Sequence, residues 1–259
     1  MEVDLMNENF DGFKKNPTDT EIENDIESLL LDGCFSPLEA LKLFPVYARR
    51  QWLKRFLAHH ELFKLTRDVP GDIVELGVFK GAGLFTWANL LEAYSIGDRT
   101  KVVFGFDNWK GFTGFDKEDG DESATAHKVI GGFDPGDHHL SLLKAIDIFD
   151  RDRFIGHKPR IKLIDGQIEE TVPIFVQNNP GIRISLIHFD CDLFAPTLAA
   201  LEALWPRVSR GGVLIFDEYA IPDWPGETAA VDKFLETVPD ARLRTFDWTN
   251  TPGAYLIKN

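Results

Sequence analysis

The chain has 259 residues, of which 44% are hydrophobic and 27% charged, a composition typical of globular proteins that bury a full core. Its 42 acidic residues outnumber 28 lysines and arginines, and a net charge of −14 disfavours partners such as nucleic acid or a membrane surface. Two cysteines, an acidic start and apolar runs too short to cross a bilayer argue against an exported, disulfide-bonded or membrane-spanning protein. We therefore expect a cytoplasmic protein.

The first quarter of the chain shows no strand pattern. Residues 1–36 are strongly acidic, with ten acids and two lysines up to residue 32, and we interpret them as a mobile or loosely docked leader. In residues 37–69, apolar and basic side chains recur at helical spacing, which predicts an amphipathic helix or a pair of helices. This extension has three candidate roles: a cover for the core, a lid over a substrate, or an arm that contacts a second subunit. We expect a homo-oligomer.

From residue 70 onward, short apolar strands alternate with helical stretches. Strands are predicted at 72–76, 101–107, 160–165, 182–190 and 212–217, and helices at 82–93, 168–177, 197–208 and 228–237. This alternation predicts a parallel sheet with helices on both faces. The last two strands, 243–246 and 254–258, are joined by too few residues for a parallel crossover, so they are predicted to form an antiparallel hairpin.

Residues 70–259 are thus expected to form one α/β domain. Inside it, residues 111–160 are rich in glycine, aspartate and histidine and do not fit the alternation of strands and helices. Insertions of this length in compact domains are commonly functional loops or disordered segments. We interpret this one either as a substrate-facing lid or as a plain surface excursion.

Acidic residues and glycines gather where the first two predicted strands end, the edge at which open parallel sheets bind ligands. Glu75, Gly77 and Gly81 belong to the turn after the first strand. Its Gly-x-x-x-Gly-x-Gly spacing lets a cofactor approach the start of a helix, but differs from the dinucleotide fingerprint. Asp107 ends the second strand, where a carboxylate can accept hydrogen bonds from ribose hydroxyls. The pairing favours a nucleoside-containing cofactor over a structural glycine turn.

Two later strands end in further acids, Asp190-Cys-Asp192 and Asp217-Glu218. Because side chains alternate along a strand, Asp190 and Asp192 are expected on the same side. Carboxylates brought this close repel one another unless a cation or protons intervene, and oxygen ligands suit Mg²⁺ or Ca²⁺ better than zinc. We therefore predict a divalent cation site, the alternative being a set of unrelated solvated caps. His188, in mid-strand, is interpreted as a core histidine.

Taken in order, several segments resemble the macrocin O-methyltransferase family. They are Glu75-Leu-Gly77, Phe106-Asp107-Asn-Trp-Lys-Gly111-Phe112, Asp190-Cys-Asp192-Leu-Phe, and Gly211-Gly-Val-Leu-Ile-Phe-Asp217-Glu218-Tyr219 followed by Pro225-Gly226. The family consists of S-adenosylmethionine-dependent, metal-dependent enzymes that methylate sugar hydroxyls of natural products. The resemblance covers about residues 40–259. It implies a Rossmann-like class I methyltransferase fold, with a mostly parallel seven-stranded sheet that ends in the antiparallel hairpin.

The resemblance also implies where the cofactor binds. It assigns Glu75, Gly77 and Gly81 to the methionine side of S-adenosylmethionine and Asp107 to the ribose. It assigns Asp165, Gly166 and Gln167 to the adenine, and this last group is a weaker match.

For the reaction, the resemblance aligns Asp190, Asp217 and Glu218 with the ligands of a Mg²⁺ ion and Asp192 with the general base. Many members have Asp-Asp where this chain has Asp217-Glu218. The implied reaction transfers a methyl group to a hydroxyl of a small-molecule acceptor, a sugar or vicinal diol of a natural product or glycoconjugate. The loop histidines His138 and His139 are the next candidates for the base.

Two other functions remain open at this stage. An NAD(P)-dependent oxidoreductase needs no set of metal-binding acids and prefers the other glycine spacing. A catalytically silent methyltransferase-like partner subunit predicts a damaged acid set, whereas all four acids are present in this chain.

Overall fold

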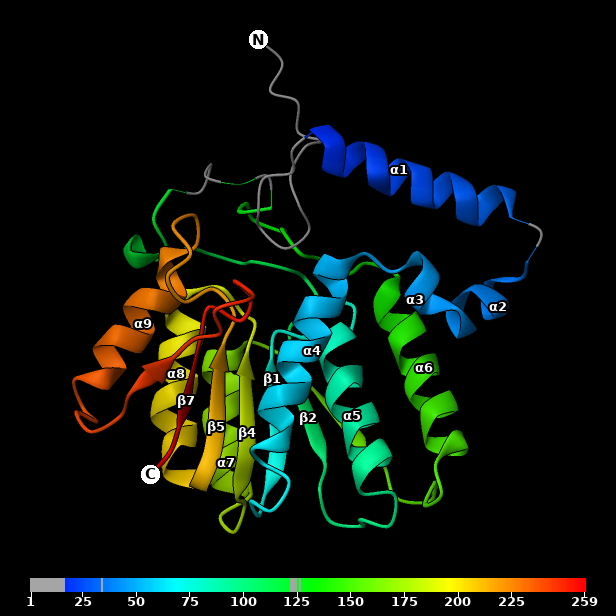
Figure 1. Ribbon diagram of the computed structural model, residues 1–259. Coiled ribbons are helices and arrows are strands. Elements are labelled where there is room, and N and C mark those ends of the chain that lie inside the picture. The colour runs from blue at the N-terminus through cyan, green and yellow to red at the C-terminus, as the bar shows by residue number, and fades with distance from the viewer. Residues whose placement is uncertain (1–16, 34, 122–124, 126) are drawn as a thin grey trace.

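The computed structural model (Figure 1) describes residues 17–33, 35–121, 125 and 127–259. Its centre is a seven-stranded sheet in the order β3-β2-β1-β4-β5-β7-β6. The first five strands pair in parallel: β1 (Asp72–Leu76), β2 (Val103–Asp107), β3 (Ile161–Asp165), β4 (Ile184–Phe189) and β5 (Val208–Phe216). β7 (Ala254–Ile257) runs antiparallel to both β5 and β6 (Leu243–Arg244). The Rossmann-like sheet with its C-terminal antiparallel hairpin is therefore confirmed.

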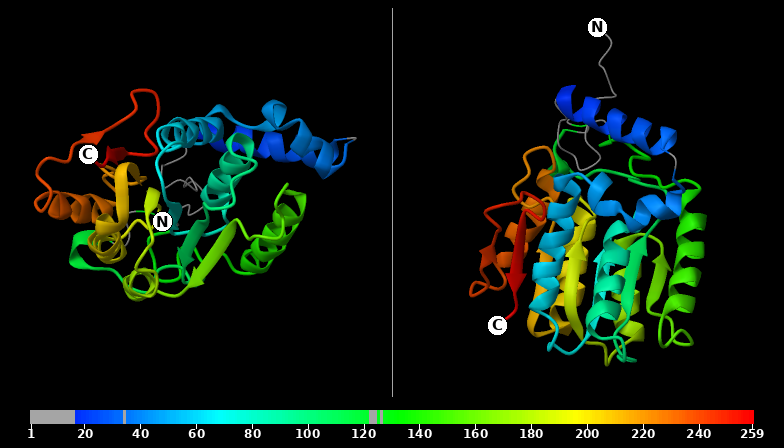
Figure 2. Two further views of the ribbon diagram at one scale, coloured as in Figure 1. Left: turned by 90° about the horizontal axis from the view of Figure 1, so that it is seen from below. Right: turned by 45° about the vertical axis from the view of Figure 1, so that its right-hand side comes forward.

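Helices cover both faces of the sheet, as the view along the strands shows (Figure 2, left). Neighbouring residues of a strand point to opposite faces, so Ile73 packs in one core layer and Val74 in the other. The layer that contains Ile73 is closed by α4 (Arg50–Lys64), α5 (Ala82–Tyr94) and α6 (His138–Asp152). The other layer is closed by α7 (Ile168–Asn178), α8 (Phe194–Leu204) and α9 (Pro225–Leu235). Burial on both faces explains why most residues of the central strands are apolar.

The 111–160 region departs from its prediction, because α6 occupies residues 138–152 and crosses from β2 to β3. Leu142 is buried, and Ile146 and Phe149 pack beside it against the core. These three positions follow helical spacing, a signal that the surrounding aspartates and histidines obscured. The alternation of strands and helices therefore continues through this region, and the irregular part is the segment before α6.

The N-terminal extension contains α1 (Pro17–Asp32), α2 (Pro37–Lys42) and α3 (Phe44–Tyr47), followed by α4. The helix α1 falls within the predicted acidic leader, and residues 1–16 and Cys34 lie outside the described residues. Figures 1 and 2 show α1 lying across the carboxyl edge of the sheet. Arg49, which precedes α4, ties the two helices together by pairing with Asp19 and Glu23 of α1. Several large apolar side chains of α2, α3 and α4 are exposed: Leu38, Leu41, Phe44, Val46, Trp52 and Phe56.

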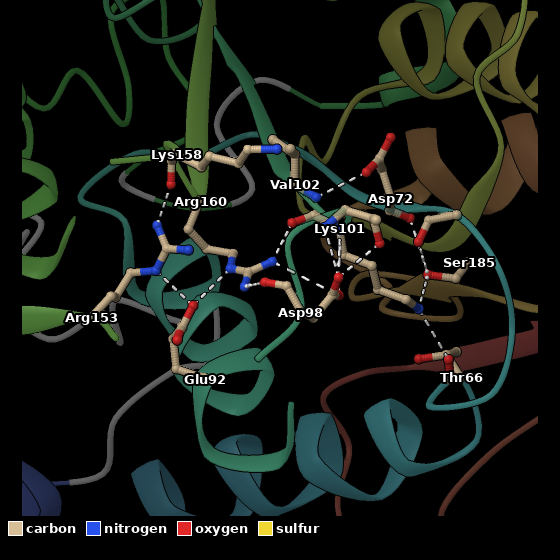
Figure 3. A network of polar contacts seen from close by, with 12 residues as sticks. Thr66, Asp72, Glu92, Asp98, Lys101, Val102, Arg153, Lys158, Arg160 and Ser185 are labelled. Atoms are coloured by element: carbon tan, nitrogen blue, oxygen red, sulfur yellow. Dashed lines mark hydrogen bonds and ion pairs between the residues drawn. The ribbon is translucent and has the colours of Figure 1, made fainter. Parts of the chain in front are cut away.

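At the amino edge of the sheet, a polar network surrounds the fully buried Arg160 (Figure 3). Its Nε donates to Glu92 at 2.8 Å, and its other nitrogens donate to the backbone carbonyls of Asp98 and Lys101. Arg153 shares the same Glu92 oxygen at 2.6 Å. The network joins the connections that precede β2 and β3, so it anchors the edge opposite the predicted acids.

Replacing Arg160 by methionine is expected to lower the free energy of unfolding by about 3 kcal/mol, because two partly buried carbonyls and part of the charge on Glu92 lose their partner. The matched control is Arg151→Met, since Arg151 pairs with Asp147 on the surface, where both side chains are 69% exposed. That change should lower the free energy of unfolding by less than about 1 kcal/mol. Urea denaturation of both variants measures the difference, and equal losses would contradict the assignment.

Within the described part of the chain, no helix is both long and apolar enough to cross a membrane.

Candidate active site

A cavity of about 400 Å³ opens at the carboxyl edge of the sheet, lined by the loops that follow the parallel strands and by the segment before α6. Most of the predicted site residues lie on its wall: Gly77, Asp107, Gly166, Gln167, Asp190, Asp192 and Glu218. The other four, Glu75, Gly81, Asp165 and Asp217, are absent from the described residues that line it. The cavity therefore joins the predicted cofactor residues to most of the predicted acids.

The turn after β1 approaches the end of β4 so closely that only glycine fits at position 77. Gly77 has a φ of 85°, and a Cβ there would lie 2.0 Å from the carbonyl oxygen of Asp190. Asp107 holds this turn, because its Oδ2 accepts hydrogen bonds from the backbone N–H groups of Val78 and Phe79, both at 2.8 Å. Its Oδ1 accepts a third from Trp109. A carboxylate can accept about four hydrogen bonds, so Asp107 retains capacity for a ribose hydroxyl.

Glutamine and asparagine side chains connect the end of β3 to the loop after β2. Asn108 donates to Gln167 Oε1 at 3.2 Å and to the carbonyl of Gly111 at 3.0 Å. Gln167 in turn donates to the Thr113 hydroxyl at 2.7 Å. Asp165, by contrast, is exposed at the end of β3. The predicted adenine side of the cavity is therefore built by residues 166 and 167.

Glu75 points away from the cavity into the layer beneath α5. It is 1% exposed, and its Oε2 lies 3.4 Å from His188 Nδ1. The helix passes so close that a Cβ at Gly83 would lie 2.8 Å from the same oxygen. Gly81 begins α5 in a left-handed conformation, facing Leu142 of α6. In this structure both residues contribute to packing around the turn after β1 rather than to the cavity wall.

Three acids converge at the other end of the cavity. Oxygen atoms of Asp190, Asp192 and Glu218 all lie within 4.8 Å of one another. Asp192 has a φ of 62°, and the Leu193 N–H donates across it to the carbonyl of Cys191 at 2.6 Å, forming a strained γ-turn. Backbone strain of this kind is characteristic of functional sites. The strain directs the second carboxylate of the Asp-x-Asp motif toward the first.

Asp217 turns instead toward cationic side chains. It is fully buried, with its Oδ2 3.1 Å from His188 Nε2 and in contact with a guanidinium nitrogen of Arg55. The same Arg55 nitrogen donates to Asp190 Oδ2 at 2.6 Å. The structure therefore groups Asp192 with Asp190 and Glu218, whereas Asp217 pairs with His188 and shares Arg55 with Asp190.

The pKa values of these groups reflect burial and their neighbours. Burial raises the pKa of Asp192, and the charges of Asp190 and Asp217 add to the effect and bring it to about 8. Burial and the charge of Asp192 raise the pKa of Glu218 well above its usual range. Burial by itself would also raise the pKa of Asp217, but Arg55 and His188 outweigh burial and lower the pKa of that carboxyl. Without a cation beside them, it is therefore unfavourable for all carboxyl groups of the cluster to be ionised at once.

His188 is buried as predicted, and its two ring nitrogens lie beside the carboxylates of Glu75 and Asp217. Burial lowers its pKa, but Asp217 and Glu75 outweigh that effect and raise the pKa to about 10. A folded-state pKa above the usual 6.5 means that His188 stabilises the fold fully below about pH 6.5 and progressively less as the pH rises toward 10.

In metal-free protein, the free energy of unfolding should therefore fall as the pH rises across this window. The fall should be smaller in His188→Gln. Urea titrations at pH 6, 8 and 9.5 compare the two slopes; equal slopes would contradict an ionised His188.

Three residues that hold the site were not predicted from the sequence. Glu227, buried in the first turn of α9, accepts a hydrogen bond from the Glu218 N–H at 2.8 Å. Asp119, also buried, accepts one from the N–H of Phe194 at the start of α8 at 2.7 Å. Arg55 belongs to the amphipathic pattern of α4, where its charge was indistinguishable from that of a solvated face. Glu227 had a signal, since it follows the Pro225-Gly226 motif directly.

The segment before α6 forms the aromatic part of the cavity wall. Phe112, Phe115, Phe133 and Trp224 all line the cavity, and Phe112 lies 5.5 Å from Phe133 and 5.7 Å from Trp224 between ring centroids. Lys128, which has no exposed surface, donates to the carbonyl of Asp223 at 2.9 Å and so fixes this segment to the loop before α9. The position supports the substrate-facing interpretation of this segment. His138 and His139 are absent from the described residues of the cavity wall.

The acid cluster fits a hard divalent cation. Among the described residues, Asp217 Oδ1, Glu218 Oε2 and Glu227 Oε2 are buried carboxylate oxygens with no hydrogen-bond partner. Buried charged oxygens without partners are costly, and an oxygen-only donor set suits Mg²⁺. Asp190 and Glu218, which face the cavity, are the residues that would hold such an ion, with Asp192 and Asp217 beside them.

Comparisons with known proteins place the chain in a family. A family model described as macrocin O-methyltransferase (TylF) matches residues 51–251. Mycinamicin III 3''-O-methyltransferase of Micromonospora griseorubida is 29% identical over 159 residues, which are 61% of this chain and 59% of that protein. The 8-demethyl-8-(2,3-dimethoxy-alpha-L-rhamnosyl)-tetracenomycin-C 4'-O-methyltransferase of Streptomyces olivaceus is 31% identical over 159 residues, 61% of this chain and 56% of that protein. The match thus spans less than two thirds of either relative.

Among solved structures, the calicheamicin methyltransferase CalS11 superposes with a TM-score of 0.87 at 33% identity, covering 94% of this chain and 93% of that one. The O-methyltransferase NovP superposes with a TM-score of 0.60 at 23% identity, covering 80% of each chain, a likeness of fold alone. The fold is therefore that of class I methyltransferases. Because the family model covers most of the sequence and the CalS11 likeness nearly all of it, the chain belongs to the macrocin O-methyltransferase family.

Proposed function

We propose that this protein is an S-adenosylmethionine-dependent O-methyltransferase that acts on a hydroxyl group of a sugar or vicinal diol in a natural product or glycoconjugate. The observation that carries the proposal is the single cavity wall that joins a nucleoside-type turn, held by Asp107, to the acids Asp190, Asp192 and Glu218. Relatives whose names describe sugar O-methylation support the acceptor class.

The chain's own residues divide the cavity between two substrates. Gly77, Asp107 and the Gly166–Gln167 turn form the side on which the methyl donor binds. The aromatic side chains of Phe112 and Phe115 and the acids form the side that receives the acceptor. Holding both reactants in one cavity removes much of the entropic cost of bringing them together.

Asp192 is the residue that we assign to accept the hydroxyl proton. It lines the cavity and projects from a strained turn beside Asp190 and Glu218. A Mg²⁺ ion, when held by these acids, supplies Lewis acidity that lowers the pKa of an acceptor hydroxyl. Glu227 keeps the Glu218 backbone in place, and Asp119 fixes the start of α8 beside the Asp190–Asp192 motif.

The expected cofactor response separates this function from the alternatives. S-adenosylhomocysteine should raise the melting temperature, because a ligand that binds only the folded state stabilises it by mass action, and NAD and NADP should not. A thermal-shift assay with the three compounds, with and without Mg²⁺, measures this. A response to NAD alone would favour the oxidoreductase, and binding of S-adenosylhomocysteine without any methyl transfer to sugar acceptors would favour the silent partner subunit.

A further inference from the structure

Arg55 of α4 reaches the acid cluster from the N-terminal extension, although α4 lies outside the methyltransferase sheet. One guanidinium nitrogen donates both to Asp190 Oδ2, at 2.6 Å, and to Asp217 Oδ2. The two carboxylates follow neighbouring strands, β4 and β5, at positions 135 and 162 residues further along the chain. Arg55 therefore bridges two acids that the resemblance assigns to a metal ion.

The electrostatic role of Arg55 is that of a counter-ion. Asp217 has no exposed surface, and the side chains of Arg55 and Asp190 are 31% and 27% exposed, so the bridge is poorly screened by water. Carboxylates packed together need positive charge or protons, and a guanidinium that donates to two of them supplies such charge. Arg55 also lines the cavity, as Asp190 and Glu218 do.

A divalent ion held by the oxygens that Arg55 contacts would compete with Arg55 for them. Magnesium binds carboxylate oxygens at about 2.0–2.1 Å and demands regular octahedral geometry. An ion held by Asp190 Oδ2 or Asp217 Oδ2 would meet the guanidinium already bound there, and the two cations would repel each other across a single shared oxygen.

We infer that Arg55 is a built-in cation that bridges Asp190 and Asp217 in the metal-free protein and gives up this bridge when a divalent ion binds. This inference rests on the metal site of the proposed function. The bridge also connects the site to the N-terminal helices, because Arg49 at the start of α4 is paired with Asp19 and Glu23 of α1. Release of Arg55 thus removes an ion pair that joins α4 to the acids of the cavity.

The test compares Mn²⁺ affinity in metal-stripped full-length protein by isothermal titration calorimetry. Arg55→Gln, and Arg55→Met as a second uncharged variant, should bind Mn²⁺ about 10- to 100-fold more tightly than the wild type, the ratio that corresponds to losing one charge-assisted hydrogen bond. Arg55→Lys keeps the charge and should stay closer to the wild type. Arg50→Gln, an exposed arginine at the start of the same helix, is the matched control and should not change the affinity.

A second readout is thermal stability, which needs no turnover. Arg55→Gln should melt below the wild type in EDTA, and Mg²⁺ should raise its melting temperature by more than it raises that of the wild type. Unchanged or weaker Mn²⁺ binding in the uncharged variants would overturn the inference. Absence of Mn²⁺ binding in every variant would overturn it together with the proposed metal site. Tighter Mn²⁺ binding without S-adenosylhomocysteine binding would leave the inference standing and reject the proposed methyltransferase.

Discussion

Asp192→Asn is expected to lower kcat by about 10²–10⁴-fold, the usual contribution of a positioned general base. Asparagine keeps the shape of the side chain and tolerates the left-handed conformation that Asp192 adopts, with φ of 62°, so the turn should survive the change. What is lost is the ability to accept a proton. The measurement is steady-state methyl transfer to a sugar acceptor, with S-adenosylhomocysteine affinity determined in parallel.

The control for this variant is Asp240→Asn, which makes the same chemical change at an exposed position after α9 and should leave kcat unaltered. If Asp192→Asn abolished Mn²⁺ binding instead, Asp192 would be a ligand and the base would have to be sought elsewhere. Its grouping with Asp190 and Glu218 makes that outcome a direct test of the roles implied by the resemblance. Unchanged turnover would show that the reaction needs no protein base.

Removal of divalent ions should lower turnover by at least about 10²-fold, and added Mg²⁺ should restore it, since stabilisation of transition-state charge by a metal is worth several kcal/mol. Glu218→Gln should weaken Mn²⁺ binding while leaving S-adenosylhomocysteine affinity nearly unchanged, because Glu218 lines the acid end of the cavity and its Oε2 has no partner among the described residues. The assay is activity in EDTA, followed by titration with Mg²⁺ and calorimetry with Mn²⁺.

The matched control is Glu236→Gln, at an exposed position just after α9, which should change neither affinity. Asp217→Asn is expected to behave differently from Glu218→Gln, because Asp217 is also the partner of His188 and Arg55. Its loss should lower the free energy of unfolding as well as metal affinity, since it leaves buried positive charge without its counter-charge. Full activity in chelator would reject the metal site.

The sequence alone was sufficient to predict the central sheet and the edge at which the site lies. Strands buried on both faces are mostly apolar, so β1, β4 and β5 could be recognised from short runs of apolar residues. The short link before β7 allowed only an antiparallel pairing. Because parallel strands end at a common edge, the positions of Asp107 and Asp190 after their strands were sufficient to bring them to one cavity.

Only the tertiary structure decided which way the acids turn and which residues hold them. A side chain beyond the end of a strand is no longer oriented by the pleat, so its direction depends on partners that are remote in the sequence. Asp217 turns toward Arg55, 162 residues earlier in the chain, whereas Asp192 turns toward Asp190 and Glu218. Local periodicity reports backbone geometry over a few residues. It carries no signal for a contact that exists only after α4 has packed beside the sheet.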